Sequence, residues 1–128
     1  AAIAICKPGV PYNTIGGVIE DYVTARGYST VTNFCGHGVG RIFHTTPPIL
    51  HYRNDKKCGV MDVGHIFTIE PMINEGTAKT AMLDDGWTVQ TLDGRRSAQF
   101  EHSLVITETG VEALTGKLPS SPRYFWEK

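Results

Sequence analysis

A single helical segment, followed by a series of short extended segments, is the feature that most limits the fold of this 128-residue chain. Between Asn13 and Arg26 the apolar residues recur at helical spacing, and Gly27 can end the helix in a left-handed conformation. After Gly27 the pattern changes to β-branched and alternating stretches, and no second helical repeat follows. Parallel strands need helical crossovers, so the sequence predicts an α+β fold with a mainly antiparallel sheet.

The predicted strands cover residues 28–34, 65–76, the second half of 84–91, and 97–107. We expect Asn13 or Thr14 to cap the helix. The opening stretch, AAIAICKPGV, has no initiator methionine and no capping residue. We interpret it as the last two turns of another helix, stopped by Pro8 and Gly9, in a chain that begins inside an element of a longer protein.

The bulk composition excludes several classes of function. A formal net charge of -1 offers no electrostatic reason to bind nucleic acid or an anionic membrane. The longest apolar run, AAIAIC, is too short to span a membrane. The three cysteines form no C-x-x-C pair, and such an odd, sparse count is more typical of a reducing compartment than of a disulfide scaffold.

The stretch FCGHGVGRIFH, residues 34–44, places His37 between two glycines. Glycine weakens a strand, and it marks a bulge or a position where a ligand comes close to the backbone. We interpret these glycines as leaving room for a ligand beside His37. On a straight strand His44 would face the opposite way, so we expect a bend at Gly38 and Gly40 to bring it into the same cavity.

Two glutamates lie on predicted strands where a ligand site would need them. Alternation in the last strand places Glu101 on a polar face and His102 on the apolar face, so these two side chains should not meet the same ligand. In the strand over residues 65–76, Glu70 shares a face with Met72. Pro71 holds the preceding residue extended and removes a ladder donor, which predicts an edge or a bulge at Glu70.

One imidazole and two carboxylates form a mixed nitrogen and oxygen ligand set, which suits Mn, Fe, Co or Zn. Two such ions sharing a carboxylate would activate a water and stabilise both ends of a hydrolytic step. The alternative is structural, because a single strand glutamate is usually solvated and a single histidine usually hydrogen-bonded. We interpret His51 and His65 in this second way, as hydrogen-bonding residues near strand ends, and Cys35 as a packing residue.

Four blocks in this order resemble the type I methionine aminopeptidases: FCGHGVGRIFHTTPPILHY, GHIFTIEPMINEG, DGWTVQTLDGRRSAQFEH and ITETGVEALT. The resemblance extends to about Gly116, and FHTTP and DGRRSAQFEH are more similar to the eukaryotic cytosolic branch than to the bacterial one. It implies a cytoplasmic protein with the pita-bread fold, of which residues 1–118 would be the C-terminal half, with a curved antiparallel sheet and a long helix. Residues 119–128 would form a poorly ordered tail, although Tyr124, Phe125 and Trp126 could dock.

The same resemblance implies a dinuclear site holding two divalent ions. His37 would ligate one ion, Glu70 would ligate and help to activate the nucleophilic water, and Glu101 would bridge both ions. His44 would hydrogen-bond the substrate at the scissile peptide and stabilise the transition state. The apolar pocket for the methionine side chain would be lined by Phe43, Trp87 and Met72.

The family's site also uses two aspartates ten residues apart and another histidine, all from the N-terminal half. This chain has no aspartate pair with that spacing, so it is expected to supply three of five metal ligands and to need the N-terminal half as a partner. The expected activity is removal of the initiator methionine from nascent proteins, with the ribosome as a further partner. Two alternatives stay open: an inactive half-domain that acts as an interaction module, and a prolidase-like peptidase, since prolidases share the fold and a G-H-G-x-G block.

Overall fold

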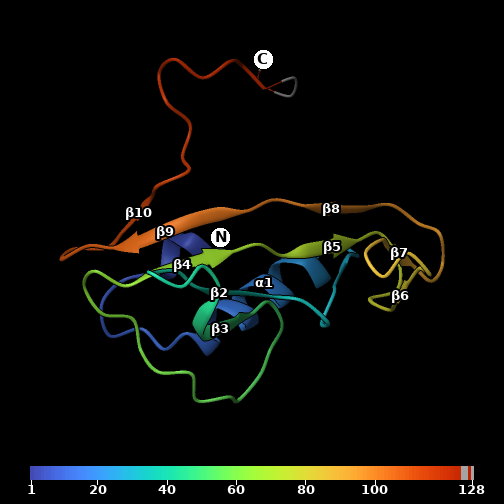
Figure 1. The fold of residues 1–128 in the computed structure, drawn as a ribbon, viewed down its shortest axis with the longest axis horizontal. Helices are drawn as coiled ribbons and strands as arrows, with labels where there is room; N and C mark the ends of the chain where they lie inside the picture. Colours follow the sequence, from blue (N-terminus) through green and yellow to red (C-terminus); the bar gives the residue numbers. More distant parts are fainter. Residues whose placement is uncertain (125–126, 128) are drawn as a thin grey trace.

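A computed structural model describes residues 1–124 and 127 of the chain. In these residues the chain forms three antiparallel sheets and one α-helix, as the helical repeat and the missing crossovers predict (Figure 1). The largest sheet has the order β10-β9-β4-β2-β3. Its strands are β2 (Cys35–Gly38), β3 (Thr45–Leu50), β4 (Ile66–Ile69), β9 (His102–Ile106) and β10 (Val111–Ala113). The smaller sheets contain β1 (Ser29–Thr30), β5 (Met72–Asn74) and β8 (Ser97–Gln99), and β6 (Thr80–Met82) with β7 (Val89–Thr91).

The helix α1 (Asn13–Thr24) contributes Ile15, Ile19 and Val23 to the hydrophobic core. Gly27 ends it with a φ of 78°, as predicted. The predicted cap is wrong, because Tyr12 holds the capping position without a side-chain hydrogen bond and the Thr14 hydroxyl donates to the carbonyl of Pro11 instead. Of the helices in the described part of the chain, none has the length and apolar character that a membrane crossing requires.

The opening segment is shorter than predicted. Only a four-residue 3-10 helix, η1 (Ala2–Ile5), replaces the two expected helical turns. Cys6 already has an extended backbone, with a φ of -72° and a ψ of 123°. Pro8 disfavours the helical conformation at the residue before it, so the chain cannot continue as a helix here.

Two predicted strands are each interrupted, which corrects the expected continuous strands over 65–76 and 97–107. The first divides into β4 and β5 at Glu70 and Pro71, because proline has no N–H to continue the ladder. The second divides into β8 and β9 at Phe100 and Glu101. The interruptions lie opposite each other, since β5 pairs with β8 and β4 pairs with β9.

Two other strands, β1 and β3, also differ from the strand ranges predicted from the sequence. The strand expected over residues 28–34 is reduced to Ser29–Thr30, although the Val31 N–H still donates to the Met72 carbonyl at 3.0 Å. The strand β3 is outside the predicted strand ranges, although His51 was expected near a strand end, and it contains Pro47 and Pro48, which are uncommon inside sheets. These prolines are tolerated because β3 is the edge strand of its sheet.

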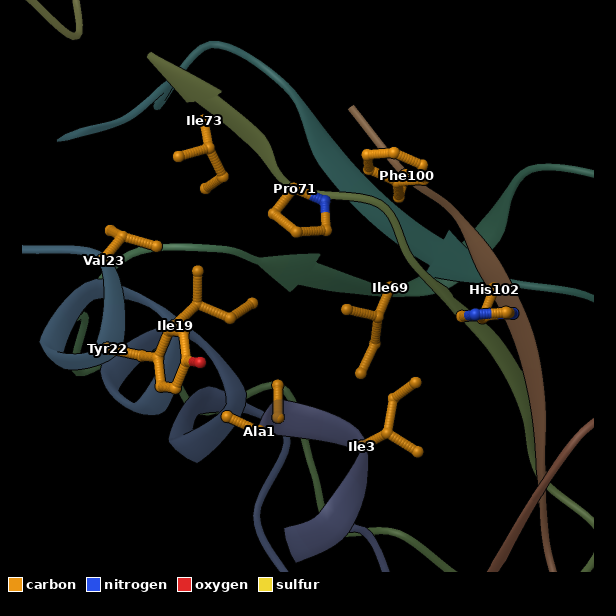
Figure 2. A pocket seen from close by; sticks show the side chains of 11 residues that line it. Ala1, Ile3, Ile19, Tyr22, Val23, Ile69, Pro71, Ile73, Phe100 and His102 are labelled. Atoms are coloured by element: carbon orange, nitrogen blue, oxygen red, sulfur yellow. The ribbon is translucent and has the colours of Figure 1, made fainter. Parts of the chain in front are cut away.

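The apolar faces of the interrupted strands line a pocket against η1 and α1 (Figure 2). Phe100 and His102 lie on this side together with Ile69 and Pro71. The alternation argument therefore separated His102 from Glu101 correctly, because Glu101 lines a different cavity.

The chain after β10 runs away from the sheets (Figure 1). In this tail the Lys117 ammonium lies 4.8 Å from the centre of the Tyr124 ring. Phe125 and Trp126 lie outside the described residues.

Candidate metal centre

A cavity of about 880 Å³ brings together side chains from the two strand interruptions, from β2 and from the β6–β7 hairpin. Six of the seven predicted site residues line this cavity. His37, His44, Glu70, Met72, Trp87 and Glu101 are in the cavity wall. The predicted pocket residue Phe43 is not in that wall, but its ring centre lies 5.5 Å from that of His37. Sequence reasoning missed further apolar residues in the wall, namely Val31, Phe34, Met82 and Val89.

His37 presents one free ring nitrogen to the cavity. Its Nδ1 lies 3.0 Å from the carbonyl of Gly38, and a carbonyl can only accept, so Nδ1 carries the proton. The Nε2 lone pair is therefore left for a ligand, which is the arrangement typical of metal-binding histidines. Nε2 lies 3.6 Å from Oε1 of Glu70, which is beyond hydrogen-bond range.

Thr68 connects these two side chains. Its hydroxyl accepts the His37 backbone N–H at 3.0 Å and donates to Oε1 of Glu70 at 2.8 Å. Thr68 is buried, so this bridge is shielded from water. The sequence contained one signal for it, since Thr68 and Glu70 lie two residues apart on the same strand face.

The two glutamates face each other across the interrupted ladder. Ile69 pairs with His102 and Met72 pairs with Gln99, so the register is the same on both sides of the interruption and places Glu70 opposite Glu101. Carboxylates directly opposite each other repel. A divalent cation between them would remove this repulsion, and the free nitrogen of His37 would complete a donor set of the kind that Mn, Fe, Co and Zn accept.

The described residues supply only part of a metal site. No group of three or more histidines, cysteines, aspartates or glutamates among residues 1–124 and 127 is arranged closely enough to hold an ion. The expected three-residue cluster is therefore not preformed, and Glu101 is exposed to solvent. The donor types fit a divalent metal, but the described residues alone do not complete its coordination.

We therefore expect the separate chain to bind Zn²⁺ or Co²⁺ with a dissociation constant above about 1 μM, because the described donors leave one side of the ion open. Titration calorimetry of the pure chain measures this affinity. A submicromolar affinity with one ion per chain would contradict the incomplete site.

His44 lies beside His37, with 4.3 Å between the two ring centres. The chain bends between Gly40 and Phe43, which turns His44 back into the cavity despite its odd spacing from His37. An imidazole in this place can donate a hydrogen bond to an oxygen bound near the metal ligands.

The glycines around His37 have a different reason from the one we inferred. A Cβ on Gly36 would lie 2.3 Å from the carbonyl oxygen of Thr68, and one on Gly38 would lie 2.0 Å from that of Thr46. The neighbouring strands, not a ligand, occupy this space, so that interpretation was wrong. The strand register shifts between His37 and Gly38, which is typical of a β-bulge.

Cys35 differs from its expected role, whereas His51 is a hydrogen-bonding residue at a strand end, as expected. Cys35 is exposed and lines the cavity, so it is not a packing residue. His51 is buried, as a hydrogen-bonded structural histidine would be, and its Nε2 accepts the backbone N–H of Glu70 at 3.2 Å. Burial lowers the pKa of His51 to about 4, so the ring is neutral at pH 7 and able to accept this bond.

His65 is structural, as expected. Its Nδ1 accepts the Tyr12 hydroxyl at 2.9 Å and the Asp62 N–H at 3.2 Å, at a distance from the cavity wall.

Comparison with known proteins decides the family. Residues 1–108 match the model of Metallopeptidase family M24. This chain belongs to that family. A protein of Dictyostelium discoideum named methionine aminopeptidase 1 is 55% identical over 120 residues, which make up 94% of this chain and 33% of that protein. The chain therefore spans about a third of the length of this relative.

Solved structures agree with this placement. The methionine aminopeptidase of Rickettsia prowazekii has a TM-score of 0.85 and 42% identity, covering 89% of this chain and 46% of that one. These likenesses confirm the predicted α+β pita-bread fold, and the higher identity to the Dictyostelium protein confirms the predicted similarity to the eukaryotic branch. The prolidase of Pyrococcus horikoshii, with a TM-score of 0.65 and 23% identity, covers 93% of this chain and 28% of that one and shares the fold alone.

Proposed function

We propose that residues 1–118 are the C-terminal half of a methionine aminopeptidase catalytic domain, with residues 119–128 as a tail, and that it removes the initiator methionine from nascent proteins. One observation carries this proposal: Glu70 lies opposite Glu101 in register, at the edge of a cavity that also receives His37 and His44. The chain's 55% identity to a protein named methionine aminopeptidase 1 supports the choice of reaction.

Two divalent ions, Co, Mn, Fe or Zn, would supply a Lewis acid and an activated water when bound. His37 would hold one of them through its free Nε2, and Glu101 would bridge both. Glu70 would ligate and accept the proton of the attacking water, since its carboxylate is already oriented by Thr68. The two missing ligands, both aspartates, would come from an N-terminal half, which would also contribute a further histidine to the site.

The substrate would enter with its N-terminal methionine side chain against the apolar wall of the cavity. Met72 and Trp87 belong to this wall, and the Phe43 ring contacts that of His44 edge-on, beside the wall. Trp87 is 87% exposed, so it is free to cover a bound side chain. His44 would donate a hydrogen bond to the scissile carbonyl oxygen, which gains negative charge in the transition state. A nascent chain leaving the ribosome is the expected source of substrate.

The test joins this chain to the preceding catalytic segment of the Dictyostelium relative in one polypeptide, loaded with Co²⁺ or Mn²⁺. We expect release of methionine from a Met-Ala-Ser peptide, and Glu101→Ala should abolish it because the bridging carboxylate is lost. Glu112→Ala is the matched control, since Glu112 is a strand glutamate on β10 outside the cavity.

Three results would contradict the proposal in different ways. A folded chimera that releases no methionine removes the aminopeptidase assignment. Cleavage of X-Pro dipeptides in preference to methionyl peptides would favour the prolidase-like alternative. Equal losses in Glu101→Ala and Glu112→Ala would show that the site assignment is wrong.

An inactive interaction module is the second candidate. It is favoured by the open metal site and by the exposed apolar side chains of Ile42, Phe43 and Trp87 around the cavity. Such a module would bind a partner without turnover in the metal-loaded chimera.

A further inference from the structure

The backbone of Glu70 depends on a residue that belongs to no predicted site. Glu70 lies at the interruption between β4 and β5, where the ladder contact of the strands is broken. Its N–H donates instead to Nε2 of His51, at 3.2 Å. Because Nε2 accepts, the ring proton lies on Nδ1, and the imidazole acts as a directed acceptor at this point.

We propose that His51 is a positioning residue that holds the main chain of Glu70 and thereby aims the Glu70 carboxylate at His37. The inference deepens the proposed function and rests on it, because Glu70 matters only if its carboxylate takes part in metal binding or turnover.

His51 is suited to this role because it is itself held in place. It follows β3 directly, and its side chain is only 2% exposed. The Thr30 hydroxyl donates to its backbone carbonyl at 3.2 Å. A buried ring on a hydrogen-bonded backbone has little freedom to follow Glu70, so Glu70 must follow the ring.

Glu70 is then restrained at three points. His51 holds its N–H, Pro71 restricts its backbone to extended conformations, and Thr68 holds its carboxylate. Removing the acceptor of His51 leaves a backbone N–H without its partner beside the metal ligands. The main chain is then free to turn, and the carboxylate loses its fixed direction toward His37, 3.6 Å away.

The experiment uses the chimera with the Dictyostelium segment. His51→Phe keeps a planar ring of similar size without an acceptor, and His51→Gln restores an acceptor at a similar reach. His65→Phe is the structural control, because it makes the same change at a histidine that accepts hydrogen bonds from Tyr12 and Asp62 and is outside the cavity wall. The measurements are Co²⁺ affinity by calorimetry, kcat and KM on the Met-Ala-Ser peptide, and thermal stability.

We expect His51→Phe to lower Co²⁺ affinity and kcat by about 10–100-fold, the range typical of residues that orient metal ligands. KM should change little, since the substrate pocket is not altered. His51→Gln should recover most of both losses. His65→Phe should lower thermal stability while leaving Co²⁺ affinity and kcat near the parent values.

A direct observation of the bond keeps the proposal testable if His51→Phe does not fold. In ¹⁵N-labelled parent protein, a scalar coupling between the Glu70 amide nitrogen and Nε2 of His51 is expected across the N–H···N bond. Absence of this coupling overturns the proposal. So does a folded His51→Phe variant with the parent's Co²⁺ affinity and kcat, or an equal loss of both in His65→Phe.

The outcomes separate this inference from the proposed function. A chimera that binds Co²⁺ but releases no methionine removes the proposed function, while a Co²⁺ affinity lowered only in His51→Phe still supports positioning. An active chimera in which His51→Phe changes nothing removes the positioning role and leaves the proposed function intact.

Discussion

Replacing Glu70 with glutamine in the metal-loaded chimera is expected to lower kcat on methionyl peptides by about a thousandfold, or roughly 4 kcal/mol of transition-state stabilisation. Glutamine keeps the shape of the side chain and can still accept the Thr68 hydrogen bond. It lacks the negative charge that holds a divalent ion, and it cannot take a proton from an attacking water. Steady-state kinetics and Co²⁺ calorimetry on the same preparation measure both losses.

Glu75→Gln is the matched control for this substitution. Glu75 comes directly after β5 and is not in the cavity wall. Its Oε1 lies 2.8 Å from a guanidinium nitrogen of Arg96. Its loss should change neither metal affinity nor kcat by more than about twofold, because exposed ion pairs contribute little. The assignment of Glu70 fails if Glu70→Gln keeps more than about a tenth of the activity, which is less than 1.4 kcal/mol of lost stabilisation.

The second large effect is on folding. Gly16→Ala is expected to lower the free energy of unfolding by about 3 kcal/mol or more, although alanine is the better helix former. Gly16 is buried in α1, and a Cβ there would lie 2.1 Å from the carbonyl oxygen of Tyr52 and 2.7 Å from that of Leu50. Both atoms belong to the main chain on either side of His51, so relief of the clash requires movement of that segment. Urea denaturation followed by circular dichroism measures the change.

Gly17→Ala, one position along the helix, should have the opposite sign. A Cβ on Gly17 would meet only a guanidinium nitrogen of Arg53 at 3.5 Å, which is ordinary contact with a flexible side chain. The gain in helix propensity should then stabilise the chain by about 0.5–1 kcal/mol. If both variants shift stability in the same direction, the close packing of α1 against the end of β3 is not what selects glycine at position 16.

Local patterns in the sequence were sufficient for the elements whose side chains alternate or repeat regularly. The spacing of Ile15 and Ile19 predicted α1 and the face it buries, and Gly27 predicted its end. Alternation separated buried Leu104 from the exposed carboxylate of Glu101, and it separated Glu101 from His102. These predictions succeed because the direction of a side chain follows from backbone periodicity alone.

Positions where backbone groups change partners were not predictable in this way. The strand β3 was not among the predicted strands, and it contains Pro47 and Pro48. Only the assembled sheet shows that this strand lies at an edge, where proline is tolerated. The glycines beside His37 indicated close approach, but only the structure shows that the approaching atoms are carbonyls of neighbouring strands.

By itself, the sequence determined the fold class, the helix, the faces of the strands and the identity of the residues with metal-ligand chemistry. The tertiary structure alone decided that Glu70 lies opposite Glu101, that Thr68 joins Glu70 to His37, and that His51 replaces a lost ladder partner. The physical reason is sequence separation. His51 and Glu70 are 19 positions apart, and His37 and Thr68 are 31 positions apart. Register and hydrogen bonding over such separations depend on how strands meet in space, and no local repeat in the chain encodes that meeting.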